Sequence, residues 1–179
     1  MLLEIGKFKA ILLEGTIPTN NSQAIIKKGT GLLAGGSGFL QCCSIEGVPS
    51  LSFARSALEN TLCSKSIGKT KNKGLLFLLW LYCTLQLEKA IMQAARTEKG
   101  CLLVVAAKDK KKLKECLEIA KRLGFKEKKG IIGKNFRKNL EVFQKQFCIS
   151  EKELFALKHL PKEKAIEALA IERQAMMAL

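Results

Sequence analysis

Short apolar runs and alternating apolar positions predict three strands. In residues 1–15, apolar side chains recur at every second position on either side of Gly6, which indicates a strand or a short hairpin. Residues 39–45 form a second candidate strand, after a glycine-rich interval at residues 29–38. The run Cys101–Ala107, CLLVVAA, has the composition of an interior strand.

Helical spacing of apolar residues predicts that most of the remaining chain is helical. Ser22 is placed to cap a short helix that reaches Lys28, and Ser50 to cap a longer one. The run Leu75–Tyr82 fits a strand or a buried helix, and its leucines and lack of β-branched residues favour helix. The expected helices cover residues 22–28, 51–62, 75–82, 85–96, 108–123 and 136–147, with a short helix from 150 and a last one from 161.

The glycine-rich interval, GTGLLAGGSG, is expected to be a mobile loop. A dinucleotide-binding loop has the spacing G-x-G-x-x-G after a strand and opens a helix, whereas these glycines lead into a strand-like segment. Gly124 is placed to end the lysine-dense helix that precedes it.

Composition and charge indicate one globular unit with a polyanionic partner. The chain has 179 residues, 47% of them apolar, and carries 31 Lys and Arg against 16 Asp and Glu, a formal net charge of +15. Nucleic acid and an anionic membrane surface both fit this charge, and so does the lysine-rich surface of a thermophile protein. Glu4, Lys7 and Lys9 interrupt any signal peptide, and the longest aliphatic run has eight residues, so we expect a soluble protein without a membrane anchor.

Cysteine and histidine usage argues against a metal site. The seven cysteines form no C-x-x-C pair, and His159 is the only histidine, so we expect no metal, no cofactor, free thiols and a reducing cytoplasm. Asp109 is the only aspartate, which leaves little for a triad or a magnesium-dependent kinase site. We therefore expect a protein that is not an enzyme, although a lone cysteine nucleophile stays open.

The decapeptide SKSIGKTKNK, residues 64–73, resembles the end of a phosphate-binding loop. That loop requires a glycine five residues before the Gly-Lys-Thr, and Cys63 stands there. The segment offers four lysines for contact with a phosphate backbone, which are Lys65, Lys69, Lys71 and Lys73. A solvated surface loop explains the same residues equally well.

The order of segments resembles the CGI-type (TPRKB-like) family of kinase-binding subunits of the KEOPS complex. The likeness is carried by SFARSALENTLCSKSIGKTKNKGLLFLLWLYCTLQLEKAIMQA, by the LLVVAA run and by the terminal EKAIEALAIERQAMMAL, and covers about residues 50–107 and 162–179. Leu85 stands where many archaeal members have an arginine.

This resemblance implies an α/β (α+β) fold, with a single domain over residues 1–179 and a small mixed or antiparallel sheet flanked by several helices. It implies a non-catalytic regulatory subunit in the synthesis of threonylcarbamoyladenosine in tRNA. Its partners are the small kinase-like ATPase of the complex and tRNA, including the 3′ CCA end. We expect a monomer when the chain is isolated.

By this resemblance, the basic decapeptide is expected to bind tRNA, and the last helix is expected to bind the kinase-like subunit. The expected tRNA-binding residues are Lys65, Lys69, Lys71, Lys73, Lys111 and Lys112. The last two belong to a lysine-dense helix start, where the positive end of the helix dipole disfavours cations, and a merely solvated cationic face is an equal alternative. The expected kinase-binding residues are Leu169, Arg173, Met176, Met177 and Leu179.

The last helix is apolar over most of its circumference. Glu163, Glu167 and Gln174 form one narrow polar stripe, and Arg173 is expected to pair with a carboxylate on the partner. For Leu169 burial in the protein's own core is the stronger alternative. Two rival functions remain, a stand-alone basic RNA-binding protein and an enzyme that binds ATP at Gly68-Lys69-Thr70.

Overall fold

One antiparallel sheet organises the structure, a computed structural model that describes residues 2–18, 21–63 and 70–177. Its strands are β1 (Leu2–Ile5), β2 (Phe8–Thr16), β3 (Gly38–Ser44), β4 (Cys101–Ala107) and β5 (Lys126–Glu127). The order is β1-β2-β4-β3, and β5 pairs with the end of β2, where Gly15 faces Glu127. The predicted opening hairpin and both later strands are confirmed, and the sheet is the antiparallel alternative.

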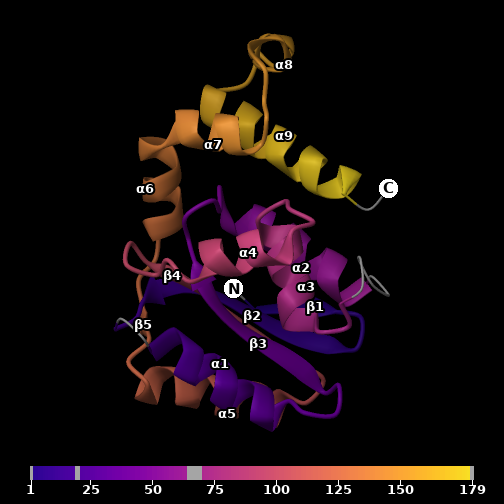
Figure 1. The fold of residues 1–179 in the computed structure, drawn as a ribbon, viewed down its shortest axis with the longest axis vertical. Coiled ribbons are helices and arrows are strands. Elements are labelled where there is room, and N and C mark those ends of the chain that lie inside the picture. Colours follow the sequence, from indigo (N-terminus) through magenta and orange to yellow (C-terminus); the bar gives the residue numbers. More distant parts are fainter. Residues whose placement is uncertain (1, 19–20, 64–69, 178–179) are drawn as a thin grey trace.

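Helices cover both faces of this sheet, so the predicted α/β class is confirmed (Figure 1). The described residues form α1 (Asn21–Leu32), α2 (Leu51–Cys63), α3 (Lys73–Leu81), α4 (Leu87–Ala94), α5 (Lys110–Arg122), α6 (Ile131–Lys138), α7 (Leu140–Gln146), α8 (Glu151–Ala156) and α9 (Lys162–Met176). In Figure 1, α1 and α5 lie on one face of the sheet, α2, α3 and α4 lie on the other, and α7, α8 and α9 extend beyond them.

The interior strand β4 separates two cores. All seven of its residues are buried. Leu102, Val104 and Ala106 belong to the larger core beneath α2, α3 and α9, whereas the alternate residues pack against α1 and α5. A strand buried on both faces must be apolar without alternation, which is why CLLVVAA was recognisable as an interior strand.

The first four residues of the glycine-rich interval are helical, so the expectation of a mobile loop over residues 29–38 is wrong for that part. Helix α1 continues to Leu32. A Cβ added to Gly29 would lie 2.5 Å from Leu40 Cδ1, so this glycine lets α1 approach β3 closely. Helix α1 also starts at Asn21, so Ser22 is not its cap. The Asn21 side chain instead donates to the Leu123 carbonyl oxygen at 2.8 Å.

The predicted helix over residues 136–147 is two helices, α6 and α7, which meet at Asn139. The backbone of Asn139 leaves helical geometry (φ −128°, ψ 31°), and its side chain donates to the Asn135 carbonyl oxygen at 2.8 Å. The bend brings Phe136 and Phe143 into an edge-to-face contact with their ring centroids 4.9 Å apart. Burial of both rings therefore takes precedence over the continuity of one helix.

None of the helices in the described part of the chain combines the length and the apolar composition that crossing a bilayer requires. The run Leu75–Tyr82 lies in and just after α3, which confirms the helix prediction.

Candidate nucleic-acid and protein interfaces

Lysines from four parts of the chain meet near the start of α3. Asn72 caps this helix by accepting hydrogen bonds from the main-chain N–H groups of Gly74 (2.9 Å) and Leu75 (3.2 Å). Lys73 is the first residue of this helix, and its Nζ lies 5.0 Å from the centroid of the Phe8 ring. The Nζ of Lys108, at the end of β4, lies 5.9 Å from the same centroid.

The surroundings of Lys73 lower its pKa below its ordinary value of 10.5. Burial is the largest cause, and the charges of Lys7 and Lys108 add to it. Close by, Ser37 accepts a hydrogen bond from the Lys112 ammonium at 3.4 Å, and its carbonyl oxygen accepts one from the Lys108 N–H at 2.8 Å. We call Lys7, Lys71, Lys73, Lys108 and Lys112 the basic cluster.

No carboxylate neutralises the basic cluster among the residues that the structure describes. The ion pairs there all involve other lysines and arginines. Asp109 accepts from the Lys111 N–H at 2.7 Å and so caps α5, which places one negative charge at the helix start that the sequence had marked as unfavourable for cations. The predicted helix from Lys108 thus begins at Lys110. An array of like charges without counter-charges favours an anionic ligand.

Two adjoining hollows of about 480 and 410 Å³ open beside the basic cluster, between α1 on one side and α3 and α4 on the other. They share Ile26, Gln41 and Leu75, and Lys71 and Lys73 line the smaller one. Gln41 is buried between them and donates to the Gly74 carbonyl oxygen at 3.3 Å. We call these hollows the groove. Both volumes lie within the range of ligand-binding clefts, about 300–1,000 Å³.

The structure brings part of the predicted RNA set together. Lys71, Lys73 and Lys112 belong to the basic cluster, and Lys111 is exposed on the first turn of α5. Lys65 and Lys69 lie outside the described residues. The predicted site residues did not include Lys7, and Lys108 was expected only as part of the lysine-dense helix start. The alternation around Gly6, which turns Phe8 inward and leaves Lys7 exposed, was the available signal.

The start of α9 is packed against the larger core. Ala165, Ile166, Leu169 and Ala170 are buried, with Leu169 only 7% exposed. The expectation that Leu169 binds a partner is therefore wrong, and burial in the protein's own core is confirmed. Side chains this well covered have no area left for another protein.

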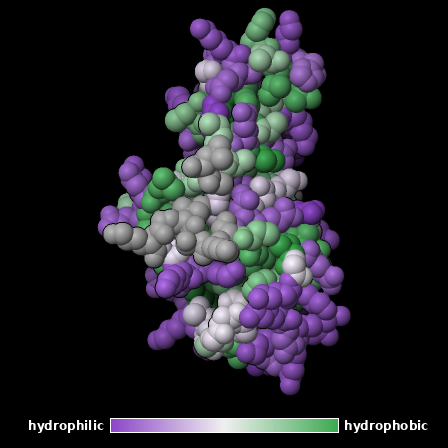
Figure 2. All heavy atoms as spheres, turned by 90° about the vertical axis from the view of Figure 1, so that its right-hand side faces the viewer, coloured by the Kyte–Doolittle hydropathy of each residue, from purple (hydrophilic) through white to green (hydrophobic). Residues whose placement is uncertain are grey.

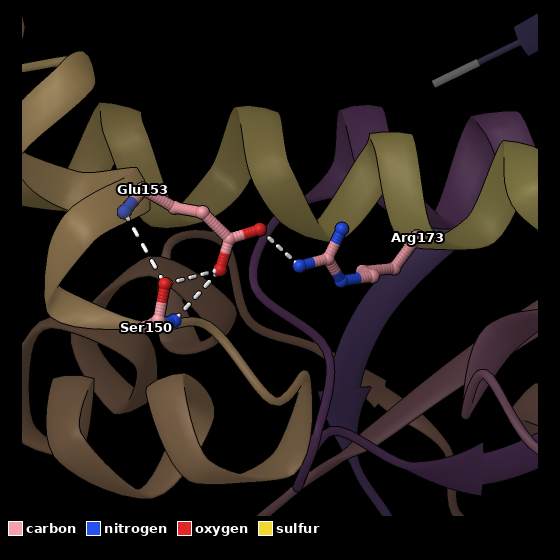
Figure 3. Close-up of polar contacts among 3 residues, drawn as sticks. All are labelled: Ser150, Glu153 and Arg173. Carbon is pink, nitrogen blue, oxygen red and sulfur yellow. Dashed lines mark hydrogen bonds and ion pairs between the residues drawn. The ribbon is translucent and has the colours of Figure 1, made fainter.

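Arg173 forms an ion pair with a carboxylate of the same chain (Figure 3). Its guanidinium donates to Glu153 on α8, so the expected pairing with a partner's carboxylate is corrected. Glu153 also accepts from the N–H and hydroxyl of Ser150, both at 2.8 Å, in a capping box. These bonds, with those from Ser150 first and that from Arg173 after them, lower the pKa of Glu153 to about 2.

The end of α9 mixes buried and exposed positions. Gln174, expected on a polar stripe, is fully buried, whereas Met176 is 54% exposed and Met177 is half-buried against the larger core. Leu179 lies outside the described residues. Figure 2 shows hydrophobic side chains among hydrophilic ones at the upper end of the molecule, the end that holds α7, α8 and α9. Met176 is thus the best exposed apolar contact among the predicted kinase-binding residues that the structure describes.

Four of the cysteines are unsuited to nucleophilic chemistry. A hydrogen bond with Cys101 and then burial raise the pKa of Cys42, and burial raises that of Cys43. Burial also raises the pKa of Cys83 to about 12 and that of Cys116 to about 11. Thiols with such values are protonated at neutral pH. Within the described ranges, no group of three His, Cys, Asp or Glu side chains is arranged to hold a metal ion.

Comparison of the sequence with protein-family models finds no match, and comparison with curated proteins finds none either.

Proposed function

We propose that this chain is a non-catalytic regulatory subunit of the KEOPS complex, which binds the small kinase-like ATPase and recruits tRNA for threonylcarbamoyladenosine synthesis in the cytoplasm. The basic cluster carries this proposal. Its lysines come from the β1–β2 turn, the start of α3, the end of β4 and α5, and no described carboxylate pairs with them. Such an arrangement suits a phosphate backbone, which a polyanion supplies and a small neutral ligand does not.

The groove supports the 3′ CCA end as the part of tRNA that is held here. It begins at Lys71 and Lys73 and continues past Leu75 to Ile91 and Thr97. Cations at its entrance fit phosphates, and the apolar interior fits unstacked bases. Hollows of about 480 and 410 Å³ are of the size that takes small ligands, which favours a few unpaired nucleotides over a double helix.

The exposed Met176 supports a protein partner at the end of α9. Exposed methionine adapts to the shape of a partner and is common in binding surfaces. The same helix also supports a second candidate, a stand-alone RNA-binding protein. Leu169 and Arg173 are both engaged within the chain, which reduces the surface available for a kinase.

Three measurements test the proposal, and the first two concern RNA and protein binding. In a filter-binding titration, Lys71→Glu with Lys112→Glu should weaken tRNA binding at least tenfold and lower its salt dependence, because two phosphate contacts are lost. Lys152→Glu with Lys158→Glu, which changes the same charge on exposed residues at and after α8, should bind like wild type. Unchanged affinity in the first variant would refute the RNA assignment.

The second measurement is co-purification with the cognate kinase-like subunit. The proposal expects a complex that is lost when residues 173–179 are removed, and also with Met176→Asp in the full chain. A complex that survives both changes, or no complex with the wild-type chain, would favour the stand-alone RNA-binding protein. Isothermal titration with Mg-ATP should give no heat, and binding of ATP would favour the enzyme alternative.

A further inference from the structure

A second and longer run of basic residues lies outside the basic cluster. Between residues 121 and 138 the chain has eight basic residues and one acid, Glu127. All eight basic side chains are exposed, and they are Lys121, Arg122, Lys126, Lys128, Lys129, Lys134, Arg137 and Lys138. We call this set the basic edge. It follows the chain from the end of α5 through β5 into α6, along one edge of the molecule (Figure 1).

Most of this charge is not compensated. Among the described residues, Lys121 alone of the eight has a carboxylate within ion-pair distance, Glu118 at 3.0 Å. Surface lysines that serve only solubility are normally interspersed with acids. A run of eight cations to one anion raises the local positive potential and therefore favours a polyanion.

The backbone of the basic edge is held in place. Strand β5 pairs with β2, and the Lys128 N–H donates to the Glu14 carbonyl oxygen at 2.9 Å. The buried Glu14 carboxylate accepts from the N–H groups of Gly130 at 2.5 Å and Ile132 at 2.9 Å, at the start of α6. This negative charge at a helix start offsets the cost of Lys128 and Lys129 beside it. A fixed segment loses little entropy when its lysines meet a ligand.

The lack of exposed large apolar residues at the basic edge helps to decide which kind of polyanion would bind there. The exposed large apolar residues of the described chain all lie elsewhere, and the two aromatic residues of this stretch, Phe125 and Phe136, are buried. An amphipathic segment that inserts into a membrane surface has apolar or aromatic anchors beside its cations. Single-stranded RNA is held where aromatic or apolar side chains accept its unstacked bases. The basic edge offers neither, which favours a phosphate backbone as its ligand.

We propose that the basic edge is a second RNA-binding surface, which takes the phosphate backbone of an RNA double helix. The inference rests on the proposed function, because tRNA supplies the duplex. The basic cluster and groove then take the single-stranded end, and the basic edge takes a paired stem. Since α5 runs from the basic cluster to the basic edge over 13 residues, about 20 Å at 1.5 Å per residue, one RNA can reach both.

The test compares two RNA probes by fluorescence anisotropy on the full chain. One is a blunt 16-base-pair RNA duplex, and the other is a single strand of 12 nucleotides that ends in CCA. The test variant carries Lys128→Gln, Lys129→Gln and Lys134→Gln. The matched control carries Lys152→Gln, Lys158→Gln and Lys162→Gln, which remove the same charge from exposed positions of α8, α9 and the segment between them.

The test variant should bind the duplex at least about tenfold more weakly than the control, and the slope of log affinity against log salt should fall by about 2 to 3. Its affinity for the single strand should be unchanged. Duplex binding that is equal in both variants would overturn the inference. So would a wild-type chain that binds phosphatidylserine vesicles but not the duplex.

The two proposals fail separately. If wild type binds the duplex through the basic edge but not the single strand, the proposed capture of the CCA end is wrong and the second surface stands. If it binds the single strand through the basic cluster and the duplex equally in both variants, the second surface is wrong and the proposed function stands.

Discussion

Gln174 on α9 donates a hydrogen bond of 3.0 Å to the main-chain carbonyl oxygen of Trp80 on α3. Helix α3 begins at Lys73, in the basic cluster, and its other end lies under α9. One helix of nine residues, about 14 Å long, therefore joins the two surfaces for which we propose different partners.

Gln174→Ala should lower the free energy of unfolding by about 1 to 2 kcal/mol, because the change removes a buried hydrogen bond and leaves space in the core. Urea denaturation measures this. Glu172→Ala, at the exposed neighbouring position, should change it by less than about 0.5 kcal/mol. Equal effects from the two substitutions would mean that the bond to Trp80 does not stabilise α9.

Glu153 should make the protein lose stability in acid. Its pKa is lowered from 4.5 to about 2 in the folded protein, so its contribution is complete above about 4.5 and is lost as the pH falls toward 2. Glu153→Gln should be less stable than wild type at neutral pH, and the difference should shrink over that interval. Urea midpoints at a series of pH values measure this, and a constant difference would contradict it.

Lys73 should make RNA binding sensitive to alkaline pH. Because its pKa is lowered, Lys73 loses its charge at a lower pH than an ordinary lysine, and an attraction to phosphate is lost with it. The affinity for a 2′-O-methyl CCA-ending strand, which resists alkaline cleavage, should therefore begin to fall in the range below pH 10.5, where an ordinary lysine still carries most of its charge. Lys73→Arg keeps its charge and should hold the affinity constant over this range. If both proteins show the same pH profile, Lys73 does not contact the RNA.

Substitutions at Leu169 and Met176, both on α9, should have different effects: the first should lower stability, and the second should abolish partner binding. Leu169→Ala should lower the free energy of unfolding by about 2 to 4 kcal/mol, since it empties a buried site. Met176→Asp should leave the unfolding midpoint near that of wild type and abolish co-purification with the kinase-like subunit. A Met176→Asp protein that is destabilised as strongly as Leu169→Ala would place Met176 in the core.

Glu14→Gln should destabilise the protein by about 1 to 3 kcal/mol, because the buried carboxylate holds two N–H groups at the start of α6. Duplex binding should also weaken, since Lys128 and Lys129 lose their fixed position. Glu127→Gln, an exposed change on the neighbouring strand, serves as the control for both thermal unfolding and anisotropy. Wild-type stability in Glu14→Gln would show that the carboxylate does not anchor α6.

The local sequence pattern predicted secondary structure correctly where the composition of a segment already indicates that the segment is buried. The uninterrupted CLLVVAA run predicted β4, and the leucine-rich run from Leu75 predicted α3, because apolar side chains in continuous runs must be buried in either conformation. The local pattern gave a wrong prediction at Gly29, where helix α1 continues, and at Asn139, where helix α6 has ended. In both places contact with a distant element, Leu40 in one case and the paired Phe136 and Phe143 in the other, decides the outcome.

The amino-acid sequence by itself determined the charge, the poverty of catalytic and metal-binding residues, and most helices and strands. Only the tertiary structure decided which charges stand together and which are paired. Lys7, Lys73 and Lys108 are far apart in the chain, and pairing of the strands brings them to one place. Arg173 meets Glu153, and Gln174 is buried, because α8 and α3 pack against α9. Periodicity gives the direction of a side chain from its own helix but not what lies in that direction.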